Sequence, residues 1–294
     1  MKIGVVGMGR MGAAIAARLI DAGHAVTVWN RSAGKMQPLV EAGATAAATP
    51  AALAGSVDSI LTILTDGAAL GQVFDGTDGL LRAKVAGKLF IEMSTVPPAT
   101  SRMLADKVRA AGAAFAECPV SGTIGPAREG KLLGLLGADA ADAARAMPIL
   151  DQLCRRVEHV GPVGSGALMK LAVNLPLMIA WQAYGEAFAL ARDLEIGGDR
   201  LLDLFADTSG ANNALKGRGP KIAAMFAGRD PGPVTFDITT AIKDLRTMLM
   251  EGAARGVSLP LLERTLGCFE DAAKNGFGGK DASMMPVYWT QRVS

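Results

Sequence analysis

The chain has 294 residues, of which half are hydrophobic and 20% are charged, and its formal net charge is +2. This length allows one large or two ordinary domains with a substantial buried core. The balanced charge gives no excess that would favour nucleic acid or a membrane surface, so we expect a small-molecule partner. No apolar run reaches the roughly 18 residues of a membrane span, and we expect no export signal at the N-terminus.

The cysteines and histidines argue against a metal site. Cys118, Cys154 and Cys268 are an odd number and lack the close spacing of metal ligands. We interpret them as reduced core residues of a cytoplasmic protein. His24 and His159 are the only histidines, which excludes a histidine-rich metal centre.

The N-terminal segment has the order strand, glycine turn, helix. A β-branched run, Lys2–Val6, precedes the turn, and an alanine-rich helical pattern follows it over residues 13–22. In dinucleotide-binding folds the three glycines allow a tight turn, close approach of a pyrophosphate and packing of helix on strand. A lone G-x-G-x-x-G is weak evidence, but its setting here predicts a dinucleotide site. The turn consists of Gly7, Met8, Gly9, Arg10, Met11 and Gly12.

The residues after the second predicted strand bear on the choice of cofactor. Ala25–Trp29 is followed by Asn30, Arg31 and Ser32. An acidic residue about 20 positions beyond the glycines would bind the ribose hydroxyls of NAD. An arginine flanked by small polar residues can instead bind a 2′-phosphate. The segment therefore favours NADP, and NAD is the alternative if Arg31 is only a solvated charge.

Strand and helix patterns alternate up to residue 160. Strands are predicted at 59–64, 88–93, 113–118, 131–136 and 155–160, with helices at 100–111 and 140–153. This alternation predicts a doubly wound α/β domain whose ligands lie beyond the carboxyl ends of the strands. Thr65, Thr95 and Ser121 follow such ends, although each is also compatible with an ordinary turn.

A glycine-rich turn at residues 161–166 opens the longest predicted helix. Lys170 and Asn174 are four residues apart on it and therefore share one face. The lysine has three donors and the amide both donates and accepts, so the pair can hold one oxygen and exchange a proton with it. Without the surrounding motifs, a lysine on a helix would be interpreted as a surface charge. We place the active site at this boundary.

Only helical patterns follow, at residues 177–190, 197–207, 220–227, 239–254 and 260–274. Pro176 removes one helical hydrogen bond and predicts a kink. The apolar stretch 177–190 favours burial against a second subunit. Lys216, Arg218 and Lys221 fall in a predicted loop, either as a solvated face or as an anion contact. We divide the chain into an NADP-binding domain, 1–162, and a helical substrate and dimerisation domain, 163–294.

Taken together, these motifs resemble the β-hydroxyacid dehydrogenase family, which includes 3-hydroxyisobutyrate dehydrogenase, tartronate semialdehyde reductase and glyoxylate/succinic semialdehyde reductase. The resemblance spans nearly the whole chain and implies a Rossmann domain, an all-α C-terminal domain, and a homodimer or homotetramer. The motifs that carry it are the glycine turn, Ser94-Thr95, Cys118-Pro119-Val120-Ser121-Gly122, Gly125, Gly130, Gly166, Lys170, Asn174 and Lys243-Asp244.

The resemblance also implies residue roles. Lys170 would be the general acid or base, and Asn174 would orient the substrate oxygen. The loop that binds the substrate carboxylate would comprise Ser121, Gly122 and Thr123, although many members have a second glycine where Thr123 stands. Further cofactor or cleft contacts would be Leu64, Thr65, Thr95, Phe236, Lys243 and Asp244.

The sequence therefore predicts an NADP(H)-dependent oxidoreductase that interconverts a small β-hydroxyacid and its semialdehyde or oxo acid, with hydride chemistry supplied by the cofactor. An imine reductase of similar fold is one alternative, but those enzymes commonly carry aspartate or tyrosine in place of Lys170. A non-catalytic NADP-binding protein is another, and the presence of Lys170, Asn174 and Ser121 argues against it.

Overall fold

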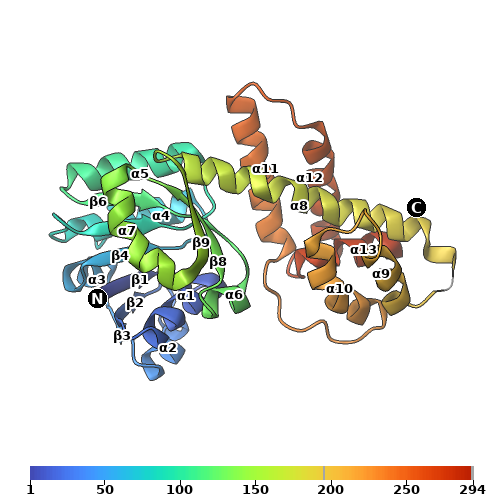
Figure 1. Ribbon diagram of the computed structural model, residues 1–294, viewed down its shortest axis with the longest axis horizontal. Coiled ribbons are helices and arrows are strands. Elements are labelled where there is room, and N and C mark those ends of the chain that lie inside the picture. Colours follow the sequence, from blue (N-terminus) through green and yellow to red (C-terminus); the bar gives the residue numbers. More distant parts are fainter. Residues whose placement is uncertain (195, 293–294) are drawn as a thin grey trace. The chain divides into compact units, whose positions relative to one another are not determined.

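The computed structural model describes residues 1–194 and 196–292, and Figure 1 shows its elements. The chain forms two compact units, Met1–Leu171 and Ala172–Ser294. The division falls within one long helix, α8 (Ser165–Leu190), which begins in the first unit and continues in the second. The boundary predicted after residue 162 lies just before this helix.

The first unit is a mixed sheet of nine strands among the described residues, in the order β3-β2-β1-β4-β5-β6-β8-β7, with β9 beside β8. The first six strands are parallel neighbours in the 3-2-1-4-5-6 order of dinucleotide-binding folds. The strands are β1 Lys2–Val6, β2 Ala25–Trp29, β3 Thr45–Ala46, β4 Ser59–Thr62, β5 Leu89–Glu92, β6 Ala114–Glu117, β7 Val120–Ser121, β8 Leu132–Gly137 and β9 Cys154–Gly161.

The far edge of the sheet differs from the simple alternation expected from the sequence. β8 runs antiparallel to both β6 and β7, and β9 runs parallel to β8. The two-residue strand β7 was not predicted, because its Val-Ser pair is too short to give a periodic pattern. The chain reverses between β7 and β8 through α6 (Ile124–Arg128).

Helices cover both faces of the sheet, which makes the domain doubly wound as predicted (Figure 1). Alternate residues of β1 point to opposite cores: Ile3 and Val5 pack under α1 and α7, and Val6 packs under α3, α4 and α5. Because both faces are buried, the strands are apolar almost throughout. The helices are α1 Arg10–Asp21, α2 Gln37–Glu41, α3 Pro50–Ser56, α4 Gly67–Asp75, α5 Pro98–Ala110 and α7 Ala140–Leu153.

The described part of the second unit is helical, as predicted. Its helices after α8 are α9 Gly198–Ala206, α10 Asn213–Phe226, α11 Ile238–Ala254, α12 Pro260–Ala272 and α13 Met285–Gln291. The prediction for α10 was wrong at its start, because Pro220 lies inside the helix, which begins at Asn213 with an Asn212 side-chain cap. Lys216, Arg218 and Lys221 are therefore helical residues and not part of a loop. Arg218 donates to the Thr235 hydroxyl at 2.8 Å, and Lys221 donates to a backbone carbonyl.

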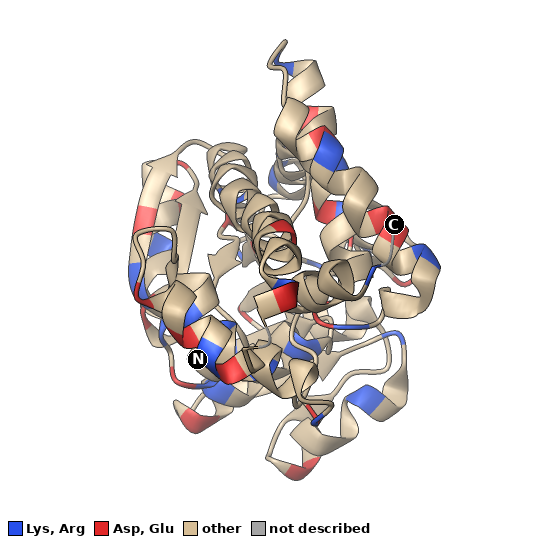
Figure 2. Ribbon diagram, turned by 90° about the vertical axis from the view of Figure 1, so that its right-hand side faces the viewer, with Lys and Arg blue, Asp and Glu red and all other residues tan. Residues whose placement is uncertain are grey.

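Helix α8 has 26 residues and continues through Pro176. Although α8 is long and apolar, no described helix combines the length and hydropathy that crossing a membrane would require. Cys118, Cys154 and Cys268 are all free and buried, as the sequence predicts. Figure 2 shows cationic and anionic residues interspersed along the ribbon, in keeping with the small net charge.

Asp281 connects the segment before α11 to the 3-10 turn Ala282–Met284. It is 6% exposed. Its carboxylate accepts hydrogen bonds from the N–H and hydroxyl of Thr235 and from those of Ser283. Burial by itself would raise the pKa of Asp281, but these hydrogen bonds and the Arg218 guanidinium lower it below its usual value. The ionised carboxylate therefore stabilises this part of the second unit.

Asp281→Ala should lower the free energy of unfolding by about 3 kcal/mol at pH 7, because several buried donors lose their acceptor. Since the pKa of Asp281 is lowered on folding, this contribution is complete above about pH 4 and is lost as the pH falls through the folded-state pKa. Urea unfolding of both proteins at several pH values would measure it. Asp230→Ala is the control, because Asp230 is exposed and its carboxylate accepts the Gly232 N–H two residues away. Equal losses in the two variants would contradict the role of Asp281.

Candidate functional site

The carboxyl ends of five parallel strands form one row. In register, Trp29 pairs with Val6, Val6 with Thr62, Thr62 with Glu92, and Glu92 with Glu117. The segments that leave these residues therefore emerge side by side at one edge of the sheet. Most of the first unit's predicted ligand contacts lie on these segments, at the edge where such folds bind ligands.

The glycine turn has the geometry that a dinucleotide requires. Gly7 has a φ of +103°, and its N–H donates to the Trp29 carbonyl at 2.9 Å. A Cβ on Gly12 would lie 1.8 Å from the Gly7 carbonyl oxygen, so only glycine allows α1 to pack this close. A Cβ on Gly9 would meet no atom within 4 Å, and no side chain caps α1 there. The turn thus leaves backbone and helix N-terminus open to a pyrophosphate.

The residues after β2 hold the glycine turn and present a cation. Asn30 accepts the Met8 N–H through Oδ1 at 2.9 Å and donates through Nδ2 to the Ser32 carbonyl. Its side chain is therefore used in fixing the turn. Arg31 and Ser32 are exposed at the same edge of the sheet. Of the three, Arg31 is the residue that can supply a charge to a phosphate.

A chain of buried hydrogen bonds connects the segments after β4 and β5. The Leu64 N–H donates to the Ser94 hydroxyl at 2.8 Å, and the Ser94 N–H donates to Oε1 of Glu92 at 2.8 Å. Ser94 is 2% exposed, and its buried hydroxyl fixes the position of the Leu64 N–H. Thr65 is exposed and Thr95 is half-buried. The structure thus brings Leu64, Thr65 and Thr95 to the same edge as the glycine turn.

The predicted carboxylate loop begins on the other side of β8. Ser121 pairs with Leu133, and Gly122 has a φ of +134° with no room for a Cβ beside Leu132. Thr123 is the residue before α6, and its hydroxyl does not cap that helix. The loop therefore needs glycine at position 122, while the hydroxyls of Ser121 and Thr123 are not used in capping α6.

Lys170 and Asn174 lie one turn apart on α8, as the sequence predicts, and both are buried, at 8% and 9% exposure. The remaining predicted contacts belong to the second unit. Phe236 lies just before α11 and is half-buried, and Lys243 and Asp244 lie within that helix. Lys243 Nζ is 2.7 Å from Asp244 Oδ1. Asp244 is buried, which makes this pair a charged element inside the second unit.

Glu117 is a residue that the sequence analysis did not identify. It is fully buried at the end of β6, and Oε1 accepts the Gly164 N–H at 2.6 Å and the Ala167 N–H at 3.2 Å. Burial raises the pKa of Glu117, against the effect of the Ser101 hydroxyl and the N–H groups at the start of α8. The signal was available, since the apolar strands LFIE and AFAE both end in glutamate at the same register.

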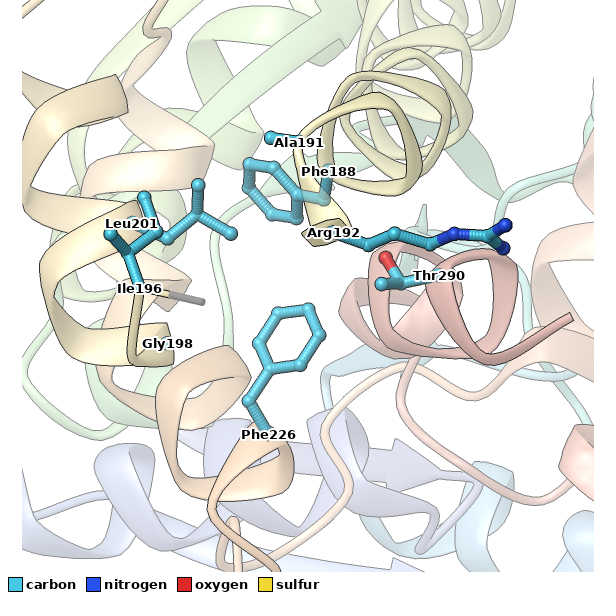
Figure 3. Close-up of a pocket in the computed structure, with 8 residues that line it drawn as sticks. All are labelled: Phe188, Ala191, Arg192, Ile196, Gly198, Leu201, Phe226 and Thr290. Carbon is cyan, nitrogen blue, oxygen red and sulfur yellow. The ribbon is translucent and has the colours of Figure 1, made fainter. Parts of the chain in front are cut away.

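The second unit contains a cavity of about 120 Å³ (Figure 3). Aromatic and aliphatic side chains line most of it, with Arg192 and Thr290 to one side (Figure 3). It includes none of the predicted site residues. Among residues 1–194 and 196–292, no cluster of three or more histidine, cysteine, aspartate or glutamate side chains could hold a metal ion.

Comparison with known proteins decides the family. Residues 2–161 match the NAD binding domain of 6-phosphogluconate dehydrogenase, and residues 164–288 match the NAD-binding region of NADP-dependent 3-hydroxyisobutyrate dehydrogenase. Over 96% of both chains, the sequence is 35% identical to glyoxylate/succinic semialdehyde reductase 1 of Arabidopsis thaliana. The chain belongs to the β-hydroxyacid dehydrogenase family. Its relatives and its glycine turn identify this family member as an oxidoreductase that uses a nicotinamide dinucleotide.

Solved structures similar to this chain include a hydroxyacid dehydrogenase and a reductive aminase. The 3-hydroxyisobutyrate dehydrogenase of Mycobacterium tuberculosis with L-serine has a TM-score of 0.84 at 25% identity, covering 97% of this chain and 98% of that one. A reductive aminase of Aspergillus terreus in complex with NADPH has a TM-score of 0.65 at 27% identity, covering 98% and 99%. The first supports the expected fold and family, and the second shows that a reductive aminase has a related fold.

The Gly9→Ala variant should still fold, because the new Cβ enters open space and Gly9 has an ordinary φ of −74°. The methyl group would stand where the backbone faces a pyrophosphate. We expect the Kd for NADPH to rise at least about tenfold, equivalent to about 1.4 kcal/mol, as measured by fluorescence titration. Gly55→Ala, also in open space but on α3, is the control. NADPH affinity equal to that of the wild type in Gly9→Ala would contradict the assignment.

Proposed function

We propose that this chain is an NADP(H)-dependent dehydrogenase or reductase that interconverts a small β-hydroxyacid and its semialdehyde or oxo acid. The observation that carries the proposal is the buried pair Lys170 and Asn174 on one face of α8. Support comes from the names of its relatives, because glyoxylate and succinic semialdehyde are small carbonyl acids and L-serine is a β-hydroxyacid. The cofactor, when bound, supplies and accepts the hydride.

Lys170 is the proposed general acid and base. During reduction its ammonium group donates a proton to the carbonyl oxygen of the substrate, and during oxidation the neutral amine accepts the hydroxyl proton. Asn174, one turn along, donates its amide N–H to the same oxygen and so orients it. The loop of Ser121, Gly122 and Thr123 supplies hydroxyl and backbone N–H groups for the substrate carboxylate.

Arg31 is the proposed determinant of NADP over NAD. It is exposed at the carboxyl end of β2, and no acidic residue stands in the segment Asn30, Arg31, Ser32. A guanidinium there can bind a 2′-phosphate through charge-assisted hydrogen bonds. The glycine turn holds the pyrophosphate, and Leu64, Thr65, Thr95, Phe236 and Lys243 are the further proposed cofactor contacts.

Imine reduction is the second candidate, because the Aspergillus reductive aminase shares the fold. Lys170 favours the hydroxyacid reaction, since a buried lysine can protonate an alkoxide oxygen as it forms. An imine nitrogen that is already protonated needs no such donor. A panel of carbonyl acids and cyclic imines with NADPH would distinguish the two reactions.

We also propose a homodimer or homotetramer in the cytoplasm. The exposed apolar residues Met169 and Val173 on α8, at 40% and 42% exposure, support association through this helix. Three free, buried cysteines support a reducing compartment. Light scattering of the purified protein would give the number of subunits.

The function is tested by following NADPH consumption with glyoxylate, succinic semialdehyde, tartronate semialdehyde and methylmalonate semialdehyde. With the best substrate, Lys170→Ala should lower kcat by about 100-fold to 10,000-fold, because proton transfer is lost. Lys170→Arg should also have a low kcat, because a guanidinium does not release its proton. NADPH affinity should change less than about threefold in both. Lys131→Ala, at an exposed lysine, is the control. Turnover near that of the wild type in Lys170→Ala would end the proposal.

Arg31→Ala should raise the KM for NADPH about 10-fold to 100-fold, the loss expected for charge-assisted hydrogen bonds. The KM for NADH should hardly change, because NADH has no 2′-phosphate. Lys35→Ala removes another exposed cation four residues later and is the control. Initial rates with both cofactors would measure the effect. An equal rise for NADPH and NADH would show that Arg31 does not select the cofactor.

A further inference from the structure

We propose that Glu117 is a positioning residue for Lys170: its carboxyl group fixes the first turn of α8 on the sheet and so sets where the next turn presents the lysine. This inference rests on the proposed function of Lys170. Both residues belong to the first unit, Met1–Leu171. Glu117 is not a catalytic residue, because it acts only through the helix.

Glu117 contacts the start of α8 directly. Oε1 of Glu117 accepts the Gly164 N–H at 2.6 Å and the Ala167 N–H at 3.2 Å. These are among the N–H groups that a helix leaves without partners inside the helix at its start. Glu117 is separated from them by about 50 residues in sequence, so the contact joins the end of β6 to the start of α8. A carboxylate at this position is also favoured by the helix dipole.

Strand β8 and helix α8 pack closely around the Glu117 carboxyl group. A Cβ on Gly137 of β8 would lie 2.5 Å from Glu117 Oε1. A Cβ on Gly166 would lie 2.4 Å from the Leu135 carbonyl oxygen and 3.2 Å from the same Oε1. Glycine at both positions lets strand and helix close around Glu117. The helix start therefore has little freedom to shift while the carboxyl group is present.

The path along α8 from this contact to Lys170 is short. Ala167 and Lys170 are three residues apart, so they lie on adjacent turns of one face. Gly161 and Gly164, on the segment that leads into α8, both have positive φ, at +136° and +99°, which favours glycine at these two positions. A slip of one residue would move the helix by about 1.5 Å and rotate it by about 100°. Such a slip would carry the Lys170 amine away from its place.

Three substitutions separate positioning from bulk stability. Glu117→Gln keeps an oxygen acceptor for the N–H groups, Glu117→Asp keeps the carboxyl group but shortens the side chain, and Glu117→Ala removes the acceptor altogether. The control is Asp142→Ala, because the Asp142 carboxylate accepts the Phe115 N–H at 3.3 Å on the same strand and pairs with Arg109. Each variant is assayed for kcat and KM with the best carbonyl substrate, for NADPH affinity, and for hydrogen exchange of peptides covering residues 164–170.

We expect Glu117→Ala and Glu117→Asp to lower kcat by about 10-fold to 100-fold, the scale of a misplacement of about 1 Å. NADPH affinity should stay within about threefold, and exchange at residues 164–170 should become at least about tenfold faster. Glu117→Gln should keep both kcat and exchange protection close to those of the wild type, and Asp142→Ala should change neither. If Glu117→Ala does not fold, Glu117→Asp gives the same comparison.

Faster exchange with unchanged kcat would overturn the inference, because Glu117 would then only stabilise the helix. Unchanged exchange in both Glu117→Ala and Glu117→Asp would overturn it as well. Lys170→Ala is assayed in parallel, so that a failure of the positioning role can be distinguished from a failure of the proposed function. If Lys170→Ala loses turnover and the Glu117 variants do not, only the positioning role fails. If Lys170→Ala keeps turnover, the proposed function fails and this inference fails with it.

Discussion

The structure of the first unit depends on the common register of its parallel strands. Because Trp29, Val6, Thr62, Glu92 and Glu117 form one row, five segments leave the sheet at the same edge. The close contact of Gly12 with the Gly7 carbonyl then seats α1 directly behind that edge. A shift in the register of one strand would displace the proposed ligand contacts on the segment that follows it. The sheet thus fixes the positions of these five segments relative to one another.

Two buried glutamates connect the loops after β4 and β5 and the start of α8 to the sheet. Glu92 holds the Ser94 backbone, and the Ser94 hydroxyl in turn holds Leu64. Glu117 holds the start of α8. Burying a carboxyl group is costly unless donors surround it. The rigidity that such contacts give to a binding edge is a reason to keep them where apolar residues would pack more simply.

Local patterns predicted most of the fold. Short stretches of sequence are enough to predict the glycine turn, the strand ends and the spacing of Lys170 and Asn174. The order of these motifs along the chain identified the family. Other features depend on distant contacts. The reversed direction of β8 follows from its pairing with β6, and α10 begins seven residues before Pro220, where a start was expected. Glu117 could not be assigned a partner from sequence, because its donors lie about 50 residues away. The roles of the individual site residues and the preference for NADP stay predictions.

The pair Lys170 and Asn174 illustrates which distances a helix fixes and which it does not. Their separation along α8 is set by helical geometry to about 6 Å, whatever surrounds them. Their position against the sheet is not set by the helix itself. It depends on where α8 begins, and that point follows a link with two positive-φ glycines. A contact at the start of the helix fixes where the next turn lies against the sheet. The buried Glu117 carboxyl group occupies that point, so the proposed proton donor is located by the same sheet that locates the glycine turn.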